Sequence, residues 1–179
     1  MPRIMVVITS GGKNWVGLPP EQEGKMHGIR IIQIPVDAEE IIPKDPVGEL
    51  PDLDGRYPEI KKAILKPEIR TWLDKKRAEI SKSILDLWIK NGLKEDVIIH
   101  IAVRCTGGFQ RSVVFAEYLF EELQRMWQTD YEEVSNCPRC EFALHHLTLP
   151  IAQIVKGWVK EKDGLLIPFS HPLTKVSVF

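Results

Sequence analysis

The sequence predicts one α/β domain over residues 1–179, with a mostly parallel central sheet and helices on both faces of that sheet. Residues 97–103 are apolar at nearly every position, which is typical of a central strand covered on both faces. Strand-sized apolar runs alternate with segments in which apolar residues recur at helical spacing. The length suits a single sizeable core, expected at about residues 4–149, with residues 150–179 as a C-terminal extension.

Local signals bound each expected element. Residues 4–9 predict a buried strand, and the glycines and prolines of residues 11–28 predict a loop. Pro35 is expected to end the second strand, and residues 35–58 form a long connection of the kind that is usually functional or mobile. The expected strands are 4–9, 29–34, 97–103, 141–149, 165–169 and 176–179; the expected helices are 59–65, 67–91, 113–127 and 151–159. The charged side chains of the 113–127 helix are expected to face outward: Glu117, Glu121, Glu122 and Arg125.

Composition excludes several classes of protein. The net charge of −1 supplies no general attraction to nucleic acid, so RNA contact would need a local basic patch. The sequence contains no stretch of about 18 apolar residues, so we expect no membrane-spanning helix. The first residues lack the length and cleavage site of a signal peptide. An odd number of cysteines, 3, suits a reducing compartment. We therefore expect a cytoplasmic protein with no membrane contact.

The turn between the central strand and the next helix has the composition of an anion-binding loop. Its residues are Cys105, Thr106, Gly107, Gly108, Phe109, Gln110, Arg111 and Ser112. Paired glycines let successive backbone N–H groups point inward, and the following helix begins with unpaired N–H groups and a partial positive charge. Arg111 adds a planar cation suited to phosphate oxygens, and Ser112 is expected to cap the helix. This interpretation requires an open turn, and an Arg111 that does not pair with a surface carboxylate.

The spacing Cys-x5-Arg-Ser is also that of the cysteine-phosphatase loop. In that chemistry the Cys105 thiolate would attack phosphorus while Arg111 holds the oxygens, and a nearby carboxyl would act as general acid. Three aspartates in the long connection are candidates, and nothing in the sequence selects one: Asp45, Asp52 and Asp54. The alternative is that Cys105 is a small core residue. Anion binding without catalysis is the favoured interpretation.

A second polar turn follows the first strand. Its residues are Ser10, Gly11, Gly12 and Lys13. In a parallel sheet this turn lies at the same carboxyl edge as the Cys105 loop, where open α/β folds bind ligands. Lys13 could hold the rest of a phosphorylated ligand, or the segment could be an ordinary glycine turn.

Two further cysteines and two histidines lie near the end of the core. Cys137 and Cys140 have the Cys-x2-Cys spacing of half a zinc site, and His145 is the nearest candidate third ligand. Incidental cysteines are the equal alternative. Neighbouring strand residues point to opposite faces, so only one of the two histidines would join a zinc site readily. His146, or alternatively His145, is a candidate for reaching the anion pocket from the end of its strand.

These residues together resemble a known family, the RapZ C-terminal domain. That family carries a Cys-Thr-Gly-Gly-x-His-Arg-Ser loop after an apolar strand, which corresponds to residues 105–112. Residues 10–13 and 17–19 resemble its Phe-Gly-Tyr-Lys-x-Gly-x-Pro turn, and residues 50–60 resemble its Leu-x-x-x-Thr-Gly segment. The similarity runs from about residue 4 to about residue 149.

The resemblance implies a pocket for a phosphorylated ligand at the 105–112 loop. In the namesake protein the ligand is glucosamine-6-phosphate, and the domain binds a small RNA and self-associates. Gln110 stands where the family has histidine, and a neutral amide cannot gain charge. No Gly-x4-Gly-Lys-Ser/Thr nucleotide loop occurs.

Three hypotheses of function follow. The first is a regulatory module that binds a phosphosugar or nucleotide-like molecule without catalysis. The second is a phosphatase that uses Cys105 and Arg111. The third is a zinc-stabilised RNA-binding adaptor centred on Cys137 and Cys140.

Overall fold

The computed structural model describes most of the chain. The described residues are 3–44, 46, 53–91, 94–131, 140–149, 160–162, 165–167 and 174–178. The strands are β1 (Ile4–Gly12), β2 (Gln22–Met26), β3 (Ile29–Asp37), β4 (Val97–Cys105), β5 (Cys140–His146), β6 (Lys160–Lys162), β7 (Leu165–Ile167) and β8 (Thr174–Val178). The helices are α1 (Lys13–Val16), η1 (Ala38–Glu40), α2 (Pro58–Ile64), α3 (Pro67–Asn91), α4 (Arg111–Met126) and η2 (Trp127–Tyr131).

A six-stranded sheet with the order β2-β3-β4-β1-β5-β8 forms the centre of the fold. The four inner strands β3, β4, β1 and β5 are parallel to one another, whereas the edge strands β2 and β8 pair antiparallel with β3 and β5. β6 and β7 form a separate two-stranded pair. The predicted α/β class with a mostly parallel sheet is confirmed.

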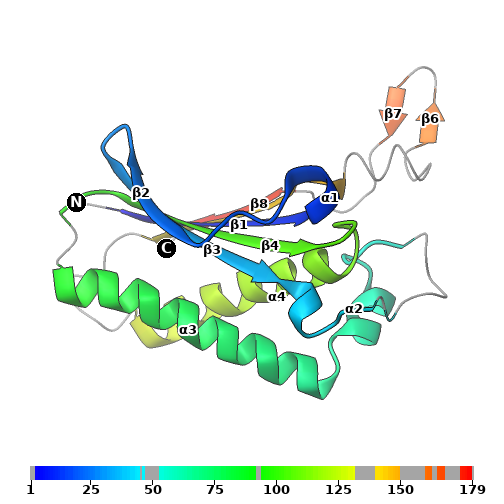
Figure 1. Cartoon of the computed structure of the whole chain (residues 1–179), viewed down its shortest axis with the longest axis horizontal. Coiled ribbons are helices and arrows are strands. Elements are labelled where there is room, and N and C mark those ends of the chain that lie inside the picture. Colours follow the sequence, from blue (N-terminus) through cyan, green and yellow to red (C-terminus); the bar gives the residue numbers. More distant parts are fainter. Residues whose placement is uncertain are drawn as a thin grey trace.

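Among the described residues, the larger helices lie on one face of the sheet, whereas the sequence predicts helices on both. Figure 1 shows α2, α3 and α4 on the same side, with the short α1 on the other side at the carboxyl end of the strands. The burial pattern gives the physical reason. In the first half of β1, Ile4 and Val6 are fully buried against the helices, whereas Met5 and Val7, which alternate with them along the strand, are only partly buried. β4 repeats this pattern, and both strands are buried at every residue only in their carboxyl halves.

Two local expectations were wrong. Residues 11–28 were predicted to be a loop, but they contain the end of β1, all of α1, and β2. β2 is exposed at all of its residues, so it has no alternation to detect, and the positive φ angles of His27 (50°) and Gly28 (80°) form its tight hairpin turn to β3. β3 also continues through Pro35 to Asp37. Pro35 is tolerated because β2 pairs with β3 only as far as Gln33, which leaves an open edge beside it.

Most of the remaining elements lie near their expected positions, although β1 runs to Gly12 rather than to residue 9, and β5 ends at His146 rather than at residue 149. α2 and α3 match the predicted helices, and α4 starts two residues earlier than expected. The expected helix at 151–159 lies outside the described residues. None of the helices in the described part of the chain has the length and apolar character to cross a bilayer.

Candidate functional site

The turns that follow β1 and β4 are in direct backbone contact. Gly12 pairs with Cys105 in the register of the two strands, so both turns leave the sheet at the same level. A Cβ placed on Gly108 would lie 2.1 Å from the amide nitrogen of Gly12 and 2.2 Å from Thr148 Oγ1. A Cβ on Gly12 would lie 2.5 Å from the carbonyl oxygen of Gly107. Only glycine fits at these contacts, and the expectation that both turns share the carboxyl edge is met.

Cys105 lies beneath the loop rather than at its mouth. Cys105 is 3% exposed, and its Sγ accepts a hydrogen bond from the Gly108 amide at 3.3 Å. The thiol lies 3.4 Å from Ser112 Oγ, to which it donates. Ser112 is therefore not the helix cap: Gln110 occupies the N-cap position of α4, without a side-chain capping bond.

The loop is held in place by the segment that precedes α2. The Gln110 side-chain amide donates to the carbonyl of Leu53 at 2.8 Å, and the Gly55 amide donates to the carbonyl of Phe109 at 2.8 Å. Of the aspartates considered as general acids, Asp54 is 1% exposed and its carboxylate is bound by the Arg56 side chain at 2.7 Å. Asp45 and Asp52 lie outside the described residues.

A carboxylate from elsewhere in the same chain accepts hydrogen bonds from donors of the loop. Glu39 Oε1 accepts from the Thr106 amide at 3.1 Å and from Arg111 Nη2 at 3.3 Å. It also accepts from the Thr106 hydroxyl, and its other oxygen forms an ion pair with Lys13. We call these donors together with Glu39 the Glu39 site.

The open turn expected from the sequence is thus filled by an acidic side chain. Arg111 is 7% exposed and does pair with a carboxylate, that of Glu39, whose side chain is 20% exposed. The cause is topological. β3 lies beside β4 with Asp37 opposite Arg104, so the chain leaving β3 passes directly over the loop that follows β4. No periodicity or motif marks Glu39, but the rule that the ends of parallel strands meet at one edge could have found it.

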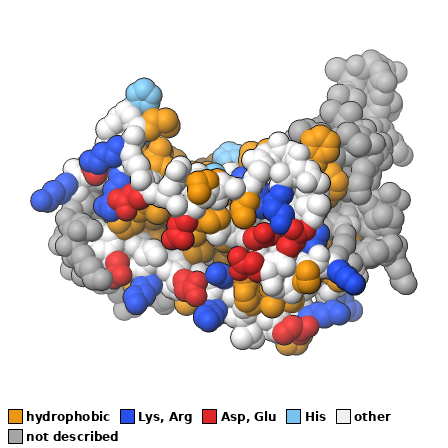
Figure 2. Space-filling view, in the orientation of Figure 1, with side chains coloured by type: hydrophobic (Ala, Val, Ile, Leu, Met, Phe, Trp, Pro, Cys, Tyr) orange, Lys and Arg blue, Asp and Glu red, His pale blue; other side chains and the backbone are white. Residues whose placement is uncertain are grey.

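The surroundings fix the guanidinium and the ammonium of the Glu39 site. Arg111 Nη1 donates to the Ile42 carbonyl at 2.6 Å, which orients the guanidinium independently of Glu39. Lys13 also binds Asp37 at 3.0 Å, and Asp37 accepts from the Glu39 amide at 3.0 Å, which caps η1. Figure 2 shows acidic and basic side chains gathered together on this part of the surface, between α1 and η1.

Electrostatics favour the charged form of both partners. Partial burial alone would raise the pKa of Glu39, but hydrogen bonds from Lys13 and Thr106 and the charges of Lys13 and Arg111 lower it to about 2. The hydrogen bond with Glu39 in turn raises the pKa of Lys13, against a smaller opposing effect of desolvation. Glu39 is therefore ionised throughout the neutral range, and the loop donors already hold an oxyanion.

His146 does not reach the rim of this site. Its side chain is completely buried on the helix-covered face, where Nδ1 lies 2.7 Å from Ser10 Oγ and Nε2 lies 2.8 Å from Glu117 Oε1. The second carboxylate oxygen of Glu117 pairs with Lys175 of β8. Glu117, expected to face outward, is 2% exposed, because α4 buries nearly all of its first three turns.

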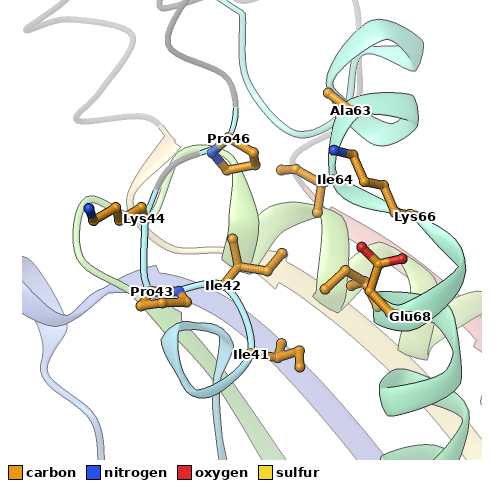
Figure 3. A pocket seen from close by; sticks show the side chains of 10 residues that line it. Ile41, Ile42, Pro43, Lys44, Pro46, Ala63, Ile64, Lys66 and Glu68 are labelled. Atoms are coloured by element: carbon orange, nitrogen blue, oxygen red, sulfur yellow. The ribbon is translucent and has the colours of Figure 1, made fainter.

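A pocket of about 310 Å³ lies beside the Glu39 site. Figure 3 shows its walls, which come from the segment after η1 and from the ends of α2 and α3, with Ile42 and Ile64 on facing sides. Ile42 connects the two features, because its carbonyl binds Arg111 while its side chain lines the pocket.

The candidate zinc ligands are not brought together by the described structure. Cys140 and His145 lie an odd number of positions apart on β5, so they face opposite sides of the sheet, and Cys137 is outside the described residues. Within the described ranges, no group of three or more His, Cys, Asp or Glu side chains could hold a metal. A zinc site that includes Cys137 stays a prediction.

A family model described as the RapZ C-terminal domain matches residues 18–135, which is more than half of the chain. The chain belongs to the RapZ C-terminal domain family. The match covers Glu39 and the whole 105–112 loop of this RapZ C-terminal domain, but it begins after Lys13 and ends before His146. No match was found among curated proteins.

Proposed function

We propose that this RapZ C-terminal domain is a regulatory module that binds a phosphorylated small molecule, without catalysis, at the 105–112 loop. The turn is not open and Arg111 pairs with Glu39, so the conditions set from the sequence are not met, but one observation carries the proposal: the loop already holds an oxyanion. The Thr106 amide, the Thr106 hydroxyl and the Arg111 guanidinium all converge on one carboxylate oxygen of Glu39. Donors that converge on a carboxylate oxygen are equally suited to a phosphate oxygen.

The chemistry of the site favours a small phosphate ester. Arg111 is oriented by the Ile42 carbonyl, so little side-chain entropy would be lost when its remaining donors bind a ligand. Lys13 stands on the other side of the same carboxylate and would contact a second phosphate oxygen. Membership of the family makes glucosamine-6-phosphate the first ligand to test.

The test is calorimetric titration of the purified protein with glucosamine-6-phosphate, with glucosamine as the ligand that lacks phosphate. We expect binding of the phosphate ester only, and a loss of at least about tenfold in affinity in Arg111→Lys, because an ammonium cannot reproduce the planar fork. Arg125→Lys is the matched control, since Arg125 lies on the same helix with its side chain 60% exposed. Equal binding by Arg111→Lys and Arg125→Lys would contradict the proposed site.

The same preparations separate binding from catalysis. A binding module predicts no hydrolysis of the phosphosugar or of a generic aryl phosphate. Turnover that disappears in Cys105→Ser would support the phosphatase instead, because the Cys105 thiol is the nucleophile that chemistry requires. RNA binding and self-association, which the family resemblance implied, stay predictions.

A further inference from the structure

Glu39 has the properties of a ligand held by the site rather than of a permanent part of it. Its carboxylate takes hydrogen bonds from the Thr106 amide and from Arg111, and an ion pair from Lys13. These are the donors that a phosphate would need. A bound phosphate and the Glu39 carboxylate therefore compete for the same positions.

The surroundings would let Glu39 leave without disturbing the core. Its side chain is 20% exposed, and it sits in the three-residue η1, of which only Ala38 is buried. Lys13 would keep its ion pair with Asp37, and Arg111 would keep its hydrogen bond to the Ile42 carbonyl. Departure of Glu39 thus leaves both cations in place and frees hydrogen-bond donors of each for a new anion.

We propose that Glu39 is an autoinhibitory latch: its carboxylate closes the anion site, and a phosphorylated ligand must displace it in order to bind. This inference rests on the proposed function, because it concerns the regulation of the same site. If the latch is closed most of the time, the apparent affinity of any ligand is its intrinsic affinity multiplied by the fraction of molecules that are open.

Competition between Glu39 and the ligand predicts how the affinity depends on the charge of the ligand. A latch that leaves the site completely lowers the affinity of every anion by the same factor, whatever the charge of the anion. A carboxylate that merely stays nearby and repels would penalise a dianion more than a monoanion. The two cases are separated by measuring two ligands of different charge on the same variants.

The experiment titrates the wild type, Glu39→Ala, Glu39→Gln and Glu40→Gln with glucosamine-6-phosphate and with its methyl phosphodiester. Glu40→Gln is the control, because Glu40 is exposed and follows Glu39 in η1, so it removes the same charge next to the site. We expect Glu39→Ala to bind both ligands about tenfold more tightly, by the same factor for each, with a smaller gain in Glu39→Gln and none in Glu40→Gln.

The other outcomes overturn the latch in distinct ways. A weaker affinity in Glu39→Ala would make Glu39 part of the ligand-binding surface. A larger gain for the phosphate monoester than for the diester would make it a repelling charge that stays in place. Binding by the wild type with no change in Glu39→Ala would remove the latch and leave the proposed function standing, whereas no binding by any of these proteins would overturn both.

Discussion

Replacement of Glu117 by glutamine is expected to lower the free energy of unfolding by about 3 kcal/mol at pH 7, since the pKa of this carboxyl falls from 4.5 to about 2 on folding. Burial alone would raise that pKa, but hydrogen bonds from His146 and Lys175 and the charges of both residues outweigh it. The Glu117 side chain is 3% exposed, so water cannot replace these partners. A glutamine has the same shape but leaves the Lys175 ammonium without its counter-charge.

The sign of the pH dependence follows from the direction of the shift. Because the pKa of Glu117 is lower in the folded protein, its contribution is complete above about pH 5 and is lost as the pH falls toward 2. The wild type should therefore lose stability over this range, and Glu117→Gln should lose less. Glu39, whose pKa is also about 2, accounts for part of the dependence that remains.

Urea unfolding at a series of pH values between 7 and 3 measures both effects. Glu121→Gln is the control on the same helix, because Glu121 is exposed, and we expect it to change the free energy of unfolding by less than about 0.5 kcal/mol. If Glu117→Gln proved as stable as Glu121→Gln, the buried network of Ser10, His146 and Glu117 would not stabilise the fold.

The second large effect is expected for Gly108→Ala. Gly108 has a φ of 80°, and its new Cβ would lie 2.1 Å from the backbone nitrogen of Gly12 and 2.5 Å from the carbonyl carbon of Gly11. The peptide bond between Gly11 and Gly12 cannot move away from this Cβ without separating the two turns. We expect a loss of more than about 4 kcal/mol in the free energy of unfolding, at the upper end of what single substitutions cause.

Gly28→Ala isolates the cost of backbone conformation alone. Gly28 has the same φ of 80°, but a Cβ there would meet no atom within 4 Å. This variant should lose only about 1–2 kcal/mol, the cost of a left-handed alanine. Urea unfolding of the two variants gives the difference, and if Gly108→Ala is too unstable to purify, its yield relative to Gly28→Ala is the readout. Similar losses for the two would mean that the turns after β1 and β4 are not in tight contact.

Sequence patterns predicted the elements that are buried in a regular way. β4 and α4 were found because their apolar residues recur at strand and helical periods, and the loop between them was found from its glycines and Arg111. β2 was missed because every one of its residues is exposed, so no periodicity exists. The end of β3 was misplaced because a proline is tolerated where a strand has no neighbour on one side.

The charged residues of the site were harder to predict than its backbone. Glu39 and Lys13 lie on different elements, and Glu117 and Lys175 lie 58 positions apart, so no local pattern links these partners. Glu117 was expected to face solvent because a carboxylate on a helix usually does, and its burial depends on a lysine of β8 that only the folded sheet brings near. The sequence therefore located the 105–112 loop but not the acidic side chain that fills it.

A crystal structure of the protein with glucosamine-6-phosphate would show whether the ligand takes the place of the Glu39 carboxylate. We expect a phosphate oxygen on the Thr106 amide and the Arg111 guanidinium, with the Glu39 carboxylate moved out to solvent and Arg111 still bound to the Ile42 carbonyl. A phosphate bound elsewhere on the protein, with Glu39 still held by Arg111 and Thr106, would contradict this expectation.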